Sequence, residues 1–207
     1  IIVGTGAAGL NAAVTLHKLG QKNIALITEG RYMGTSRNTG SDKQTYYKMT
    51  QCGSEPDSVR KMAKTLFEGG CVDGDIAMAE AAGSLRAFYH LVDIGVPFPF
   101  NKSGEYVGYK TDHDPLKRGI SAGPLTSKYM TECLERQAEE RGIPFFDGYQ
   151  AVRLLTEEKD GEKRAAGIIA LNKQKAASPD ERYAVFSAVN IIWATGGEAG
   201  MYQASVY

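Results

Sequence analysis

IIVGTGAAGLNAAVTLHKLGQKNIALITE, residues 1–29, predicts a short apolar strand, a glycine-rich turn, an amphipathic helix, a second strand and an acid at its end. In the turn, Gly4 permits the tight bend, Gly6 lets a pyrophosphate approach the backbone, and Gly9 lets the helix pack on the strand. Glu29 follows Gly9 by 20 residues, the separation at which an acid hydrogen-bonds a ribose hydroxyl. A lone glycine motif also fits an ordinary turn, but here strand, helix and acid agree and predict a dinucleotide site. The motif leaves NAD and FAD open as ligands.

The composition is that of a globular protein with no nucleic-acid partner. The 207 residues are 43% hydrophobic, and 24 Lys and Arg residues balance 24 Asp and Glu residues. No apolar run approaches the roughly 20 residues that a transmembrane helix needs, so no membrane segment is predicted in this chain. The three cysteines lie far apart without metal-ligand spacing, so we predict reduced thiols, no metal site and a cytoplasmic protein. The chain does not begin with Met, and we expect further residues before Ile1.

The rest of the chain changes from a helical to a β pattern. A glycine- and hydroxyl-rich loop is expected at 30–43, where ligands collect in open α/β sheets, although a plain surface loop fits the same composition. A second irregular stretch, 106–124, carries a polar cluster of a kind that is usually solvated: Asp112, His113, Asp114, Lys117 and Arg118. The last strand, with Trp193, is expected to be buried beside the first. Helix 75–94 is expected to bury Ile76, Ala79, Ala82, Leu85, Phe88, Tyr89 and Val92. Further predicted elements are helices at 59–67 and 125–141, strands at 144–146, 150–156, 165–171, 182–186 and 190–194, and a polar loop at 172–181.

Six motifs occur in the order found in one enzyme family. They are IVGTGAAGL at 2–10, TSRNTG at 35–40, GVPF at 95–98, SAG at 121–123, GIIA at 167–170 and ATGG at 194–197. In this order the chain resembles the flavoprotein subunits of succinate dehydrogenase and fumarate reductase, and L-aspartate oxidase is similar. The resemblance implies FAD rather than NAD. It also implies an α/β fold: a Rossmann-like FAD-binding domain of the glutathione-reductase type, with a parallel sheet, a β-meander and a helical excursion.

The resemblance also implies a division of the chain and a set of cofactor contacts. Residues 1–207 would form an incomplete FAD-binding domain, with a nucleotide-binding core at 1–50 and 144–200, a helical excursion at 54–143, and a capping domain after residue 207. The pyrophosphate would lie on Gly4, Gly6, Ala7, Ala8 and Gly9. Glu29 and Gly30 would hold the adenosine ribose, and Ala151 and Val152 the adenine edge. The flavin side would be lined by Ser36, Asn38, Thr39, Gly40, Ser41 and Asp42, and the phosphate and ribose region by Ala194, Thr195, Gly196 and Gly197.

For the chemistry, the resemblance implies hydride exchange between flavin N5 and a dicarboxylate-like or unsaturated acid. The Arg that handles the companion proton would follow residue 207, so chain 1–207 is expected to be inactive alone. Candidates for substrate contact are Phe98, at the mouth of the dicarboxylate site, and His113, Lys117 and Arg118. The family tethers FAD through a His in a Ser-His-Thr motif. The counterpart here is Asn38, which cannot form that bond, so we predict non-covalent FAD.

The sequence leaves two questions open, the electron partner and the class of function. The electron donor or acceptor is undetermined. A protein of another class, a non-catalytic dinucleotide-binding or electron-carrying subunit, fits the same glycine motif.

Overall fold

The structure is a computed structural model that describes residues 1–41, 44–52, 55–112, 114–197 and 203–204. It divides into two compact units, one made of Ile1–Thr39 with Leu134–Tyr207 and the other of Gly40–Cys133. Helix α5 (Thr126–Glu140) contributes residues to both. Within the described ranges, no helix has the length and apolar character needed to cross a bilayer.

A four-stranded parallel sheet forms the centre of the first unit. Its strands, in sheet order, are β5 (Phe145–Asp147), β2 (Leu26–Thr28), β1 (Ile2–Val3) and β9 (Ile192–Trp193). Val3 lies between Ile27 on one side and Trp193 on the other, and the Ala194 N–H donates to the Val3 carbonyl at 2.8 Å. The predicted pairing of the returning strand with the first strand is therefore confirmed. The fold class is confirmed with it.

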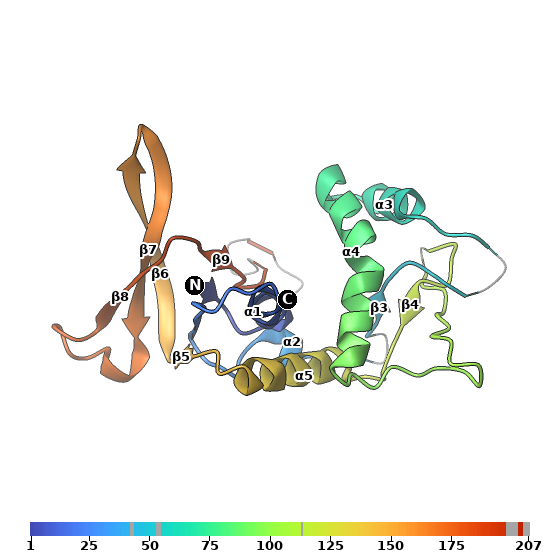
Figure 1. Cartoon of the computed structure of the whole chain (residues 1–207), viewed down its shortest axis with the longest axis horizontal. Helices are drawn as coiled ribbons and strands as arrows, with labels where there is room; N and C mark the ends of the chain where they lie inside the picture. Colours follow the sequence, from blue (N-terminus) through green and yellow to red (C-terminus); the bar gives the residue numbers. More distant parts are fainter. Residues whose placement is uncertain (42–43, 53–54, 113, 198–202, 205–207) are drawn as a thin grey trace. The chain divides into compact units, whose positions relative to one another are not determined.

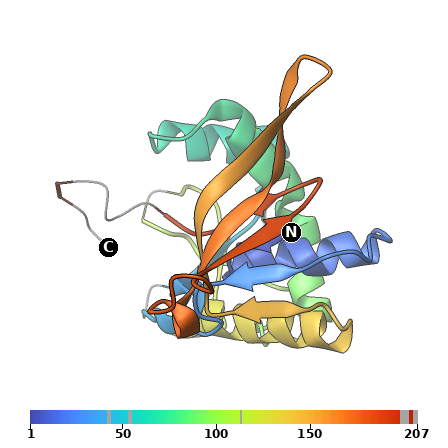
Figure 2. The ribbon, with the colours of Figure 1, turned by 90° about the vertical axis from the view of Figure 1, so that its left-hand side faces the viewer.

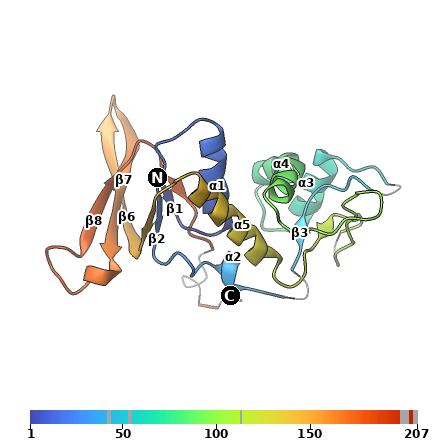
Figure 3. The ribbon, with the colours of Figure 1, turned by 60° about the horizontal axis from the view of Figure 1, so that its bottom comes forward.

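Each face of this sheet is covered by a different layer. Helix α1 (Ala7–Lys18) lies on one face and buries Leu10, Ala13 and Val14. An antiparallel meander lies on the other face, where Ile168 packs on Val3 and Ile27 (Figures 1 and 3). The meander consists of β6 (Tyr149–Lys159), β7 (Glu162–Asn172) and β8 (Tyr183–Ser187). Figure 2 shows the β6–β7 hairpin extending past the sheet. Because β1 pairs in parallel with β2 and with β9, the carboxyl ends of these three strands lie at one edge of the sheet.

The second unit pairs two helices with a short antiparallel ribbon. Helix α3 (Val59–Glu68) starts at Ser58, whose side chain accepts from the Lys61 N–H, and α4 (Gly74–Asp93) starts at Asp73, whose carboxylate accepts from the N–H groups of Asp75 and Ile76. These are ordinary N-caps, which satisfy amides that have no partner within the helix. The ribbon consists of β3 (Tyr46–Tyr47) and β4 (Gly119–Ile120).

The structure corrects the predicted buried face of α4. The buried residues are Ala77, Ala81, Ser84, Phe88 and Leu91, so of the predicted stripe only Phe88 is fully buried. The physical reason is that α3 packs against Ala77 and Ala81, whose small side chains allow close approach but give a weak apolar pattern. Ile76, at 63% exposure, faces solvent within the described part of the chain.

Four further expectations were wrong in detail. The loop at 30–43 contains a one-turn helix, α2 (Thr35–Asn38), and the loop at 172–181 begins with the 3-10 turn η1 (Lys173–Lys175). The irregular stretch 106–124 supplies β4. Strand β9 is not buried, and Trp193 is 51% exposed. The reason is that β9 lies at the edge of the sheet formed by the described residues. Turns this short leave no periodic signal, and a strand's burial depends on neighbours far away in sequence.

Candidate cofactor site

The turn after β1 can be built only from glycine at two positions. Gly4 has φ +107°, and a Cβ there would lie 2.8 Å from the Ala194 carbonyl carbon. A Cβ on Gly9 would lie 3.0 Å from the carbonyl carbon of Gly4, so any side chain would push α1 off the turn. The need for glycine at the tight bend of Gly4 and at the close packing of Gly9 therefore has a direct steric cause.

This turn aims the first amides of α1 at an open space. The Ala7 N–H donates to Ser36 Oγ at 3.3 Å, while those of Ala8 and Gly9 have no acceptor among the described residues. Unpaired N–H groups and the helix dipole together make such a helix start a favourable place for an anion.

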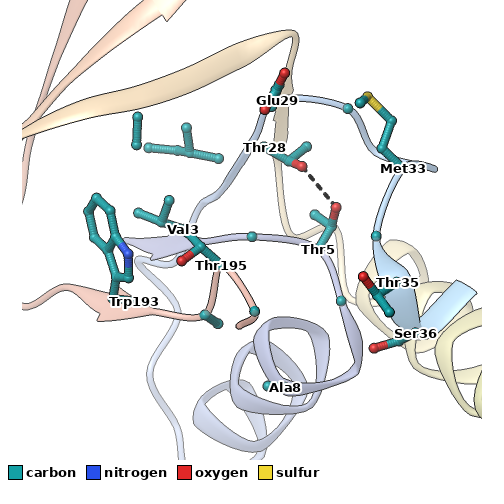
Figure 4. A pocket seen from close by; sticks show the side chains of 18 of the residues that line it. Val3, Thr5, Ala8, Thr28, Glu29, Met33, Thr35, Ser36, Trp193 and Thr195 are labelled. Carbon is teal, nitrogen blue, oxygen red and sulfur yellow. Dashed lines mark hydrogen bonds between the residues drawn. The ribbon is translucent and has the colours of Figure 1, made fainter. Parts of the chain in front are cut away.

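A cavity of about 580 Å³ lies in front of these amides, at the carboxyl ends of β1, β2 and β9 (Figure 4). Its size is within the ordinary range for cofactor pockets. Of the residues predicted for the cofactor, those that line it are Gly4, Gly6, Ala7, Ala8, Glu29, Gly30, Ser36, Ala151, Ala194, Thr195 and Gly196. The lining residues that the sequence reasoning missed are Val3, Thr5, Ile27, Thr28, Met33, Gly34, Thr35, Tyr149, Gln150 and Trp193.

The remaining predicted contacts lie elsewhere. Gly9 lies beneath the turn, and Val152 is 51% exposed on the meander. Asn38 turns its amide back to the carbonyls of Tyr32 and Gly34, at 2.6 and 3.1 Å. Thr39 and Gly197 are outside the lining, and Gly40 and Ser41 belong to the second unit. Asp42 and His113 fall outside the described residues.

Two buried hydroxyls form part of the cavity wall. Thr5 Oγ1 donates to Thr28 Oγ1 at 3.0 Å, which ties the end of β1 to the end of β2 (Figure 4). A usable sequence signal existed for both, since Thr5 lies inside the glycine turn and Thr28 ends β2 directly before Glu29.

The acid predicted for the ribose has a partner. Glu29 Oε1 accepts from Lys173 Nζ at 2.9 Å, and both side chains are more than two-fifths exposed. In Figure 4, Glu29 lies at one side of the cavity and the Trp193 indole at another. The carboxylate is thus held at the cavity without being buried.

The described candidates for substrate contact, Phe98, Lys117 and Arg118, belong to the second unit and are not among the residues that line this cavity. Phe98 is buried against Phe88 and Tyr46, with ring centroids 4.9 and 5.8 Å away. Arg118 is also buried, so the expectation of a solvated polar cluster was wrong for it and for Asp114.

Arg118 is held by a network of side chains. Its guanidinium donates to both Asp57 oxygens at 2.9 and 2.7 Å and to Thr65 Oγ1 at 2.9 Å, and it also contacts Tyr47 and Asp114. Burial, together with the hydrogen bond to Asp114, raises the pKa of Tyr47 to about 12. The side chains of Arg118, Asp57 and Asp114 are buried, and pairing is what makes the burial of these charges tolerable.

Taken together, a glycine turn, an exposed helix start and an acid at the next strand end define a dinucleotide-binding α/β protein. The chain matches the family model described as FAD binding domain over residues 1–205. It therefore belongs to this family, and FAD is the cofactor. Among the residues that the structure describes, no three His, Cys, Asp or Glu side chains gather as a metal site.

Two similar proteins are an oxidase and the flavoprotein subunit of a reductase. L-Aspartate oxidase of Agrobacterium fabrum is 26% identical over 211 residues, covering 99% of this chain and 37% of that protein. The 8-methylmenaquinol:fumarate reductase flavoprotein subunit of Wolinella succinogenes is 26% identical, covering 95% and 31%. This chain thus spans about a third of the length of these curated relatives.

Solved structures show the same fold at lower identity. FrdA of the E. coli quinol fumarate reductase superposes with a TM-score of 0.78 at 21% identity, over 98% of this chain and 33% of that one. Sdh1 of Mycobacterium smegmatis, solved with UQ1, gives 0.81 at 18% identity, over 99% and 35%.

Proposed function

We propose that the 580 Å³ cavity holds FAD without a covalent bond, and that the protein carrying this chain is an FAD-dependent oxidoreductase acting on a dicarboxylate-like or unsaturated acid. The observation that supports it most is the turn Gly4–Gly9, which presents free helix amides to a cavity that Glu29 also lines. The match of residues 1–205 to the FAD binding domain supports the choice of cofactor.

The residues of the cavity suit the parts of FAD. The pyrophosphate would lie against the amides of Ala7 and Ala8, where the bare Gly6 leaves room for its oxygens. Glu29 would accept hydrogen bonds from the adenosine ribose, with Lys173 holding its carboxylate. The backbone near Ala151 would meet the adenine edge. When bound, the flavin supplies hydride exchange at N5.

The chain's own side chains would orient the cofactor and limit water. The hydroxyls of Thr5 and Thr28 fix the two strand ends between which the pyrophosphate and ribose would lie. Ser36 already accepts a hydrogen bond from the Ala7 N–H, so its hydroxyl marks the position that a phosphate oxygen would share. The absence of a His at Asn38 supports a non-covalent cofactor.

Two measurements test this proposal. The purified protein should show flavin absorption bands, and acid precipitation should leave the flavin in the supernatant. Flavin that stays in the precipitate would contradict non-covalent binding. A protein that neither carries FAD nor binds it on titration would contradict the cavity assignment.

The substrate class needs its own test. Chemically reduced protein, kept free of oxygen, should be reoxidised by fumarate or a related unsaturated acid, as seen from the return of flavin absorbance. A matched saturated acid should have no such effect. Failure of every unsaturated acid, with FAD bound, would favour the other class of function, an electron-carrying subunit.

A further inference from the structure

One buried carboxylate holds two arginines of the segment that forms one wall of the cavity. We call residues 30–38 the cavity loop, because five of its members, Gly30, Met33, Gly34, Thr35 and Ser36, line the cavity. Arg31, near the start of this loop, donates from Nε to Glu135 Oε1 at 2.5 Å. Arg37, near its end, donates from Nη2 to the other oxygen, Oε2.

Glu135 belongs to α5, and its side chain is only 10% exposed. The two arginine side chains are 18% and 13% exposed. A charged hydrogen bond that is largely shielded from water is stronger than one on the surface, and removing one partner of such a group is costly. The single carboxylate therefore fixes both ends of the segment between Arg31 and Arg37.

The surroundings of Arg31 strengthen this arrangement. Its guanidinium also pairs with Glu139 and lies 4.1 Å from the centroid of the Phe145 ring, while its backbone N–H donates to Asp147 Oδ1 at 2.9 Å. Burial would lower the pKa of Arg31, but the hydrogen bonds to Glu135 and Glu139 outweigh it and the pKa is raised. The guanidinium therefore stays charged, and its ion pairs with Glu135 and Glu139 anchor the loop.

The cavity loop places the Ser36 side chain next to the first amides of α1. Ser36 precedes Arg37 directly, and its Oγ lies 3.3 Å from the Ala7 nitrogen at the start of α1. The position of Ser36 is thus set one residue away from the Glu135 contact. Nothing in the glycine motif requires this acid, which lies 98 residues further along the chain from Arg37.

We propose that Glu135 is a positioning residue of the FAD site, which clamps the cavity loop through Arg31 and Arg37 and so holds Thr35 and Ser36 against the cofactor. This inference rests on the proposed function, in that it takes the cavity to be the place where FAD binds. Glu135 itself touches neither the cavity nor the proposed cofactor.

The test compares Glu135→Gln with Glu139→Gln in the purified protein. Glu139 lies one helical turn further on, is 52% exposed and pairs only with Arg31 among the ion pairs of the described residues, so it is a matched control. Trypsin cleaves after arginine, and mass spectrometry of the peptides reports cleavage after Arg31 and after Arg37 separately. In the FAD-free protein, Glu135→Gln should speed cleavage at both positions by about tenfold or more, since local opening sets the rate.

FAD affinity is measured beside cleavage. Glu135→Gln should weaken FAD binding by about tenfold, and Glu139→Gln by less than about threefold, in line with an exposed ion pair. Added FAD should slow cleavage of the wild type at both arginines. If Glu135→Gln does not give folded protein, Arg37→Lys tests the same contact, because it keeps the charge and the trypsin site but cannot reproduce the planar guanidinium contact.

The outcomes separate the two proposals. Wild-type protein that does not bind FAD would refute the proposed function. Wild-type binding combined with unchanged cleavage and affinity in Glu135→Gln would refute the clamp alone. Faster cleavage spread over the whole chain, with a lowered unfolding midpoint, would also refute it, because Glu135 would then be a general stability residue.

Discussion

The steric role of Gly4 can be isolated by comparing it with Gly20. Both glycines have a left-handed backbone, with φ of +107° and +94°, and they lie before and after the same helix. An alanine Cβ at Gly20 would meet nothing within 4 Å, whereas at Gly4 it would lie 2.8 Å from the Ala194 carbonyl carbon and 3.4 Å from the Thr195 nitrogen. The two substitutions therefore share the backbone strain and differ in the contact with the end of β9.

The magnitudes follow from this difference. Left-handed backbone strain at a non-glycine residue costs about 1–2 kcal/mol, which is the expected loss for Gly20→Ala. Gly4→Ala adds the cost of overpacking, about 1–3 kcal/mol, and should lower the free energy of unfolding by roughly 2–5 kcal/mol in total. The strain is relieved only if Ala194 and Thr195 move, and both line the cavity. FAD affinity should therefore fall at least about tenfold, equivalent to about 1.4 kcal/mol, for Gly4→Ala and stay unchanged for Gly20→Ala.

Urea unfolding gives the stability difference, and titration followed by flavin fluorescence gives the affinity. Both variants should be compared with the wild type at equal protein concentration. The reasoning is refuted if Gly4→Ala costs no more stability than Gly20→Ala and binds FAD as tightly as the wild type. Equal losses of affinity in the two variants would refute it as well, since only one of them touches the cavity.

Three further predictions concern single residues. Trp193 is the one tryptophan of this chain and lines the cavity, so FAD should quench its emission, and the quench should vanish in Trp193→Phe; an emission unchanged at saturating FAD would remove Trp193 from the site. Arg118→Met should lower the free energy of unfolding by about 3–5 kcal/mol in urea, because it leaves Asp57 and Asp114 buried without their shared cation, while FAD bound per folded molecule stays the same. Burial alone would raise the pKa of Asp57, but the hydrogen bonds from Arg118 and from the Thr50 and Ser58 amides lower it below 3.8. Its contribution is therefore present above that pH and lost as pH falls through the lowered pKa, so Asp57→Asn should flatten the acid limb of stability against pH.

The part of the site that the sequence could predict is the part built from neighbours in the chain. Gly4, Gly6, Gly9 and Glu29 lie within one strand, turn, helix and strand, and the geometry of that unit is fixed by standard spacings. The role of Ala194 could be predicted as well, because small residues at the end of a returning strand allow a ligand to approach the backbone closely. The structure bears out that closeness, since the Ala194 carbonyl occupies the space where a Cβ of Gly4 would be.

The parts that could not be predicted depend on contacts between distant segments. Arg118 contacts Asp57, which is 61 residues away in the sequence, and Tyr47, which is 71 residues away. Because these partners are remote in sequence, the stretch around Arg118 reads as a solvated polar cluster from the sequence alone. Glu135 is similarly remote from the loop that it holds. The face of α4 was misjudged for a different reason, because Ala77 and Ala81 carry too little apolar surface to outweigh larger residues on the exposed side.

The strand order explains why the cavity lies where it does, and it gives a last prediction. From β1 the chain passes through α1 to β2 on one side, and it returns through the meander to β9 on the other side. Connections that leave the carboxyl ends of adjacent strands in opposite directions open a crevice there, and this is where ligands bind in open α/β sheets. Gly4, Glu29 and Ala194 are the first residues past the ends of β1, β2 and β9, so all three strands contribute to the crevice.

Every lining residue of the cavity belongs to the first unit. Most of the lining residues with a predicted role are assigned to the adenosine and the phosphates of FAD, and few to the flavin ring. ADP contains the adenosine and the pyrophosphate of FAD, whereas FMN contains the flavin but no adenosine. ADP should therefore compete with FAD and restore Trp193 emission in a dose-dependent way, while FMN at the same concentration should not. Competition by FMN alone would place the cavity at the flavin end of the cofactor and overturn the assignment of Glu29 to the ribose.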